Sequence, residues 1–137
     1  MSGKTVLAGA AALAVVVLAA GCGGEKVSRT ACKAPATSAS TGLSASFPVA
    51  AELTFTAASK DGPSNLVDGY WTADLDSVYV EYQDQLKKAG YTLTHTEKDE
   101  HDAEINYKGS GRSGQVALKD DCTESSTTRV HIADRPA

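Results

Sequence analysis

The feature that most constrains the fold is one amphipathic segment, residues 74–89, set among short stretches in which apolar and polar residues alternate. Its apolar side chains recur at spacings of three and four, which places them on one face of a helix: Leu75, Val78, Tyr79, Tyr82, Leu86 and Ala89. Asp74 or Asp76 can cap the start of this helix, and Gly90 can take the left-handed conformation that ends it. A single helix of this kind needs a sheet against which to bury its apolar face.

Alternation predicts strands on both sides of the helix. Two precede it, at 53–57 and 66–72, with a turn cluster at 61–65. Four follow it, at 91–96, 103–108, 116–118 and 130–132. The predicted class is α+β: a single antiparallel sheet of two strands, then the helix, then a four-strand meander, with the helix packed on one face. In this pattern His95 shares the core-facing side with Tyr91 and Leu93, and His131 faces solvent.

The first 21 residues are typical of a secretory leader. Lys4 is followed by the apolar run 6–20, which is shorter than the roughly 20 residues that cross a bilayer. The segment Leu18-Ala19-Ala20-Gly21-Cys22 then resembles the lipobox of bacterial lipoproteins, although Ala19 stands where that family most often has leucine. The alternatives are an uncleaved anchor, or ordinary signal cleavage that leaves Cys22 as a free thiol.

The lipobox resemblance implies a processing route and a location. In that family the chain is cut between the residues matched by Gly21 and Cys22, and a diacylglyceryl group is attached to the cysteine sulfur. The protein would then be lipid-anchored through Cys22 to the outer face of the cytoplasmic membrane, in the bacterial cell envelope. The expected division is 1–21 as lipoprotein signal peptide, 22–46 as a flexible Ala/Ser/Thr/Gly tether, and 47–137 as a small α+β domain.

Two further cysteines remain once Cys22 carries a lipid. In an oxidising compartment we expect Cys32 and Cys122 to form a disulfide; two free thiols are the alternative. Large apolar residues are sparse from Cys22 onward, so such a thin-cored domain would depend on this covalent link. If the bond forms, the free tether shrinks to the few residues before Cys32.

The candidate sites are weak. Residues 97–104 are rich in acids but lack the ordered spacing of a calcium loop, so a solvated hairpin and no metal are expected. Residues 109–114 hold the elements of an anion nest around Arg112, but a hairpin connection is favoured. The candidate ligand surface consists of Tyr70, Trp71 and Arg112. The alternative for the two aromatic residues is that they pack in the core.

These observations favour a binding function over catalysis. The chain contains neither a Gly-x-Ser-x-Gly elbow nor a His-Glu-x-x-His motif, so no catalytic residue and no cofactor are assigned. Its formal net charge of −4 argues against nucleic acid as a partner. The segment 70–91 also resembles small secreted bacterial domains to which no activity is attached. We expect a noncatalytic envelope lipoprotein that binds a protein partner or a small ligand; a small envelope hydrolase without a recognisable motif is the alternative.

Overall fold

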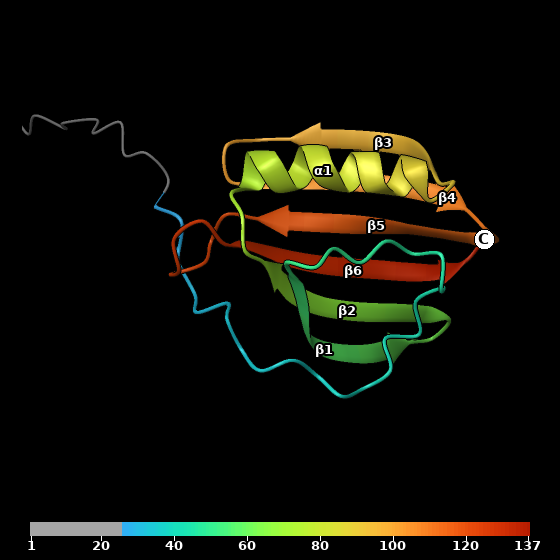
Figure 1. Ribbon diagram of the computed structural model, residues 1–137, viewed down its shortest axis with the longest axis horizontal. Helices are drawn as coiled ribbons and strands as arrows, with labels where there is room; N and C mark the ends of the chain where they lie inside the picture. Colours follow the sequence, from blue (N-terminus) through green and yellow to red (C-terminus); the bar gives the residue numbers. More distant parts are fainter. Residues whose placement is uncertain (1–25) are drawn as a thin grey trace, which may run out of the picture.

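The computed structural model describes residues 26–137. The predicted signal peptide, the cleavage position Gly21 and the lipidated Cys22 therefore lie outside the described residues. Seven elements follow in chain order (Figure 1): β1 (Leu53–Asp61), β2 (Ser64–Trp71), α1 (Leu75–Lys88), β3 (Thr92–Lys98), β4 (Asp102–Gly109), β5 (Arg112–Lys119) and β6 (Thr128–Pro136). Among these residues no helix combines the length and apolar character needed to cross a membrane.

The strands form one antiparallel six-stranded sheet in the order β1-β2-β6-β5-β4-β3. The predicted α+β class with a single antiparallel sheet and one helix is therefore confirmed. The last strand, β6, lies in the interior of the sheet, where it pairs with β2 on one side and β5 on the other. This placement joins the strands before the helix to those after it, so that β1 and β3 are the two edges.

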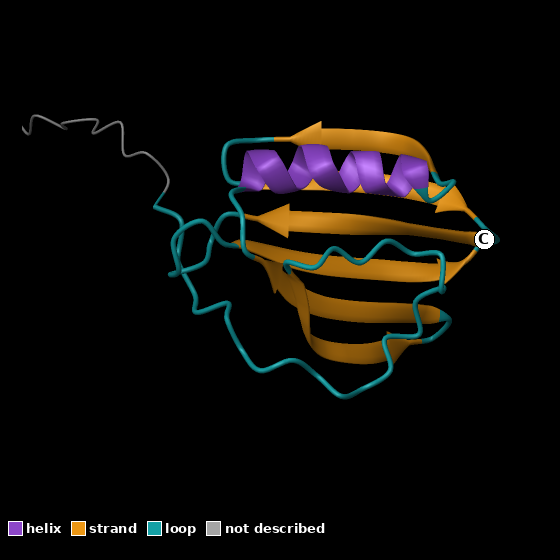
Figure 2. Cartoon of the chain, in the orientation of Figure 1, coloured by secondary structure: helices purple, strands orange, loops and turns teal. Residues whose placement is uncertain are grey.

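Helix α1 begins and ends where its local signals predict. The carboxylate of Asp74 accepts hydrogen bonds from the Ser77 backbone N–H at 2.9 Å and the Ser77 hydroxyl at 2.8 Å, and these bonds lower the pKa of Asp74. Gly90, just beyond the C-cap, has φ of 89°. The helix lies over β3, β4 and β5 (Figure 2), and its buried side chains are Leu75, Val78, Tyr82 and Leu86.

The rest of that sheet face is covered by the chain before β1. Phe47 is buried among the aromatic rings of Tyr82, Tyr91 and Tyr107, with ring centroids 6.3, 6.2 and 5.6 Å away. Leu43 and Ala50 also pack against the core. Phe47 therefore lies on the same side of the sheet as α1, and the strand residues buried on this side are mostly apolar, with Asn65, Thr128 and Asp134 as the polar exceptions.

Residues 29–46, most of the predicted tether, contact the domain at several points. The Thr37 backbone N–H donates to the Phe55 carbonyl at 2.8 Å, which places this stretch along β1. The Asn65 side-chain amide donates to the Gly42 carbonyl at 2.9 Å. Figure 1 shows the segment passing around the β1 side of the sheet before it crosses β6.

One expectation about a side chain is wrong. His95 does not share the core-facing side with Leu93, because the register of β3 against β4 shifts between these two residues. Such a bulge inserts one extra residue and turns the following side chains to the other face. The His95 side chain is 59% exposed.

Candidate functional site

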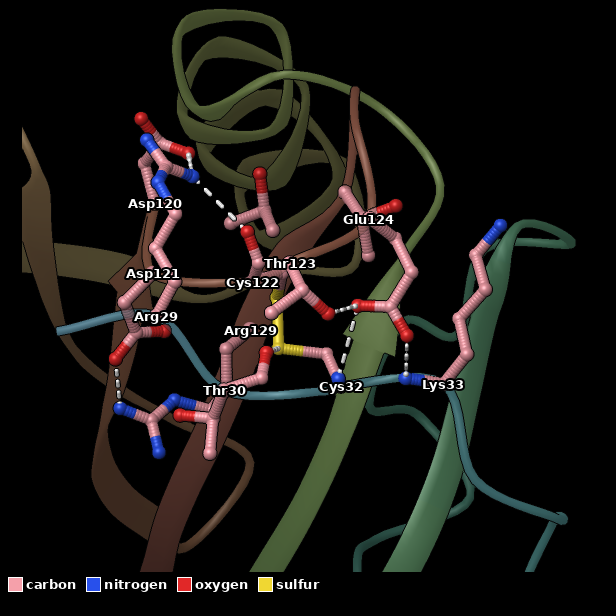
Figure 3. The surroundings of a disulfide bond; sticks show 12 residues. Arg29, Thr30, Cys32, Lys33, Asp120, Asp121, Cys122, Thr123, Glu124 and Arg129 are labelled. Carbon is pink, nitrogen blue, oxygen red and sulfur yellow. Dashed lines mark hydrogen bonds and ion pairs between the residues drawn. A yellow bond between two sulfur atoms is a disulfide. The ribbon is translucent and has the colours of Figure 1, made fainter.

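The disulfide between Cys32 and Cys122 joins the chain before β1 to the loop between β5 and β6 (Figure 3). The two Cα atoms are 5.3 Å apart and 90 residues apart in sequence. Backbone hydrogen bonds support the junction: the Thr30 N–H donates to the Asp121 carbonyl at 2.8 Å, and the Thr123 N–H donates to the Thr30 carbonyl at 2.8 Å. The predicted disulfide is therefore present.

Glu124 also holds the segment that contains Cys32, independently of the disulfide. Its carboxylate accepts the backbone N–H groups of Cys32 and Lys33, each at 3.0 Å. These two bonds lower the pKa of Glu124 to about 2, because they stabilise its charged form. On the opposite side the guanidinium of Arg29 donates to the Cys122 carbonyl at 2.9 Å. The junction thus combines a covalent bond with charge-assisted hydrogen bonds.

Ligating atoms of Cys32, Cys122 and Glu124 lie within 4.8 Å of one another, a spacing that could hold a metal ion. Metal ions bind cysteine as the thiolate, however, and both sulfurs are committed to the disulfide. In this state the junction is a structural link.

The three residues of the predicted ligand surface do not meet. Trp71 is only 1% exposed and packs edge-on against Tyr82, with ring centroids 5.3 Å apart, so it belongs to the core. Tyr70 immediately precedes Trp71 in β2, so strand alternation points its side chain to the other side of the sheet. Arg112 lies at the start of β5, where its guanidinium is occupied by Asp134.

Asp134 is the centre of a buried polar network. It is 1% exposed, and its carboxylate accepts bonds from the Tyr107 hydroxyl at 2.8 Å and from Nε of Arg112 at 2.9 Å. Burial raises the pKa of Tyr107, and donation to Asp134 raises it further. Each polar group in this network therefore has a hydrogen-bond partner. Arg112 stabilises the fold through Asp134 and is not available as a ligand-binding residue.

The acidic stretch 97–104 forms the end of β3, a short turn and the start of β4. The Asp99 N–H donates to the Asp102 carbonyl at 2.8 Å, which closes the turn. Glu97 and Glu104 stand opposite each other on neighbouring strands. Across the described part of the chain, the one cluster of potential metal ligands is the disulfide group, and the stretch contributes no residue to it.

The sheet face opposite α1 carries the remaining candidate groups, and we call it the open face. Alternation along β4, β5 and β6 places on it the residues that lie between the buried ones. His131 Nδ1 lies 2.7 Å from the Asp68 carboxylate across the β2-β6 pair. Beside this pair is a hollow of about 250 Å³ lined by Asp68, Ala117, Lys119, Arg129 and His131.

A larger hollow of about 450 Å³ lies toward the C-terminal end of β6. Its polar lining consists of the amides of Asn106 and Gln115, the hydroxyls of Ser64, Thr94 and Ser113, the imidazole of His95 and the guanidinium of Arg135. Sequence reasoning missed this set, because its members come from β2, β3, β4, β5 and β6 and meet only through the strand order. The one sequence signal for this hollow was the set of polar residues that alternate with the apolar ones along each predicted strand.

No family model, curated protein or solved structure matches the chain.

Proposed function

We propose that the chain is a membrane-anchored envelope lipoprotein whose α+β domain is a noncatalytic binding module. The observation that carries the proposal is the open face of the sheet: its two hollows are lined by polar side chains, while the opposite face is filled by α1 and Phe47. A sheet with one packed and one solvated face offers its outer side chains to a ligand without disturbing the core.

The leader and the disulfide together support the location. A lipobox-like segment ends at Cys22, and a disulfide such as Cys32–Cys122 is typical of oxidising compartments outside the cytoplasm. Ten positions separate Cys22 from Cys32 in the sequence. With a lipid on Cys22, the disulfide end of the domain would lie close to the bilayer, and the opposite end, which holds the β4-β5 turn, would point away from it.

Site-specific crosslinking in the native envelope tests the binding function. A photoreactive residue at Gln115 lies in the larger hollow, and one at Lys87 occupies an exposed position of α1 as the matched control. We expect a crosslinked envelope protein or small molecule at Gln115 and none at Lys87. Equal yields at both positions, or none at either, would contradict the open face as the binding surface.

One observation favours the hydrolase as a second candidate. The 2.7 Å contact between His131 and Asp68 orients the imidazole as in acid-base pairs of hydrolases. A screen of ester and amide substrates with wild type and His131→Ala decides this question. Turnover that disappears in the variant supports the hydrolase, and its absence in both proteins leaves the binding module.

A further inference from the structure

The floor of the larger hollow is formed by β4, β5 and β6 in two rows of cross-strand partners, with Ser64 of β2 and His95 of β3 at its sides. In one row Ala133, Gln115 and Asn106 are aligned across β6, β5 and β4. In the next row Arg135, Ser113 and Lys108 are aligned in the same way. Ala133 has a short side chain between longer neighbours, which leaves room above the sheet. The volume of about 450 Å³ falls within the range of small-molecule sites.

Most of the polar side chains around this hollow are uncharged hydroxyls and amides, and Arg135 and the imidazole of His95 line it beside them. Within residues 26–137 the side chains of Ser64, Asn106 and Ser113 form no hydrogen bond to the protein, and Gln115 uses only its amide N–H, on Glu104 at 3.0 Å. Hydroxyls and amides both donate and accept, so they can match a ligand that has several hydroxyl groups. A saccharide is the ligand class with that pattern.

The charge around the hollow is positive although the chain as a whole is acidic. Arg135 lines it and Lys108 flanks it, both side chains are exposed, and neither belongs to an ion pair in the described part of the chain. No carboxylate lines the hollow itself. The nearest ones, Glu97 and Glu104, lie outside it and contact the lining residues His95 and Gln115. By contrast, Arg29, Lys98, Arg112 and Arg129 are each paired with an aspartate. The two cations at the hollow are therefore free to meet a negative group of the ligand.

We propose that this hollow binds an acidic saccharide, with the amides and hydroxyls on its hydroxyl groups and Arg135 on its carboxylate. The proposal rests on the proposed binding function and names its ligand class. The anchored domain would present the site away from the bilayer, because the hollow lies toward the end of the sheet opposite the disulfide.

Calorimetric titration of the full-length protein in detergent tests this assignment, with trigalacturonate, neutral maltotriose and inorganic phosphate as probes. We expect trigalacturonate to bind at least about tenfold more tightly than either other probe, as a charge-assisted bond requires. Arg135→Ala should weaken it about tenfold, whereas Lys60→Ala, an exposed cation outside the hollow, should leave it unchanged. Asn106→Asp should abolish binding, because it places a carboxylate in the hollow.

Equal binding of all three probes, no binding of trigalacturonate, or an unchanged affinity in Arg135→Ala would overturn the assignment. The crosslinking experiment at Gln115 separates this failure from that of the proposed function. Capture of a different partner at Gln115 would retain the binding module and remove only the acidic saccharide. Failure of both experiments would remove both proposals.

Discussion

Removal of the disulfide is expected to destabilise the domain strongly. The bond joins residues 90 apart, and that interval contains β1 to β5. In the chain-entropy model, closing a loop of this length lowers the entropy of the unfolded chain enough to stabilise the fold by about 4 to 5 kcal/mol. Unfolding about 110 residues releases roughly 0.23 kcal/mol/K, so Cys32→Ala with Cys122→Ala should lower Tm by about 20 °C.

The loss should also have a local component that can be measured separately. Without the bond, the segment around Thr30 is held by backbone pairing and by Glu124, which accepts the N–H groups of Cys32 and Lys33. These amides should therefore exchange with solvent faster than amides in the interior strands β5 and β6.

Scanning calorimetry and amide hydrogen exchange of the double variant provide the two readouts, and reduced wild type is the matched control. A fall in Tm of less than about 5 °C in both proteins would refute the loop-closure argument. A large fall in Tm in the double variant, without a fall in reduced wild type, would show that the alanine substitutions and not the loss of the disulfide cause the effect.

Three further predictions concern Asp134, Tyr82 and Glu124. Asp134→Ala should cost about 3 to 5 kcal/mol in urea unfolding, because it leaves the partly buried Arg112 and the buried Tyr107 hydroxyl without an acceptor. The triple variant Asp134→Leu, Arg112→Met and Tyr107→Phe removes all three polar partners together and should be close to neutral. Tyr82→Phe should raise the unfolding free energy by about 1 kcal/mol, because the buried Tyr82 hydroxyl has no hydrogen-bond partner among the described residues; a loss of stability would contradict this. The pKa of Glu124 is lowered from 4.5 to about 2, so its stabilisation is complete above pH 4.5 and lost as the pH falls through about 2. The Tm difference between wild type and Glu124→Gln should shrink over that interval, and a constant difference would show that the carboxylate charge is not responsible.

Local sequence signals were sufficient for the helix. The predicted segment 74–89 and the observed helix Leu75–Lys88 differ by one residue at each end. The reason is that the Asp74 cap, the spacing of the apolar residues and Gly90 all act within one or two turns. The strands were recognised for the same reason, since burial of alternate residues leaves a period of two in the sequence.

Features that depend on distant contacts were not predictable. Nothing within β6 records that it pairs with β2, and the place of Ser64 beside Arg135 in the larger hollow depends on that pairing. The bulge that exposes His95 interrupts an alternation that looks regular in sequence. Arg112 looked free in a glycine-rich turn, but its partner Asp134 lies 22 residues away.

The intact mass of the full-length protein extracted from bacterial membranes tests whether Cys22 anchors it. We predict a chain that begins at Cys22 and carries a diacylglyceryl group, and the same chain with Cys22→Ser should lose both the lipid and the membrane association. A wild-type mass without a lipid adduct would contradict the proposal that this domain works as an anchored envelope lipoprotein.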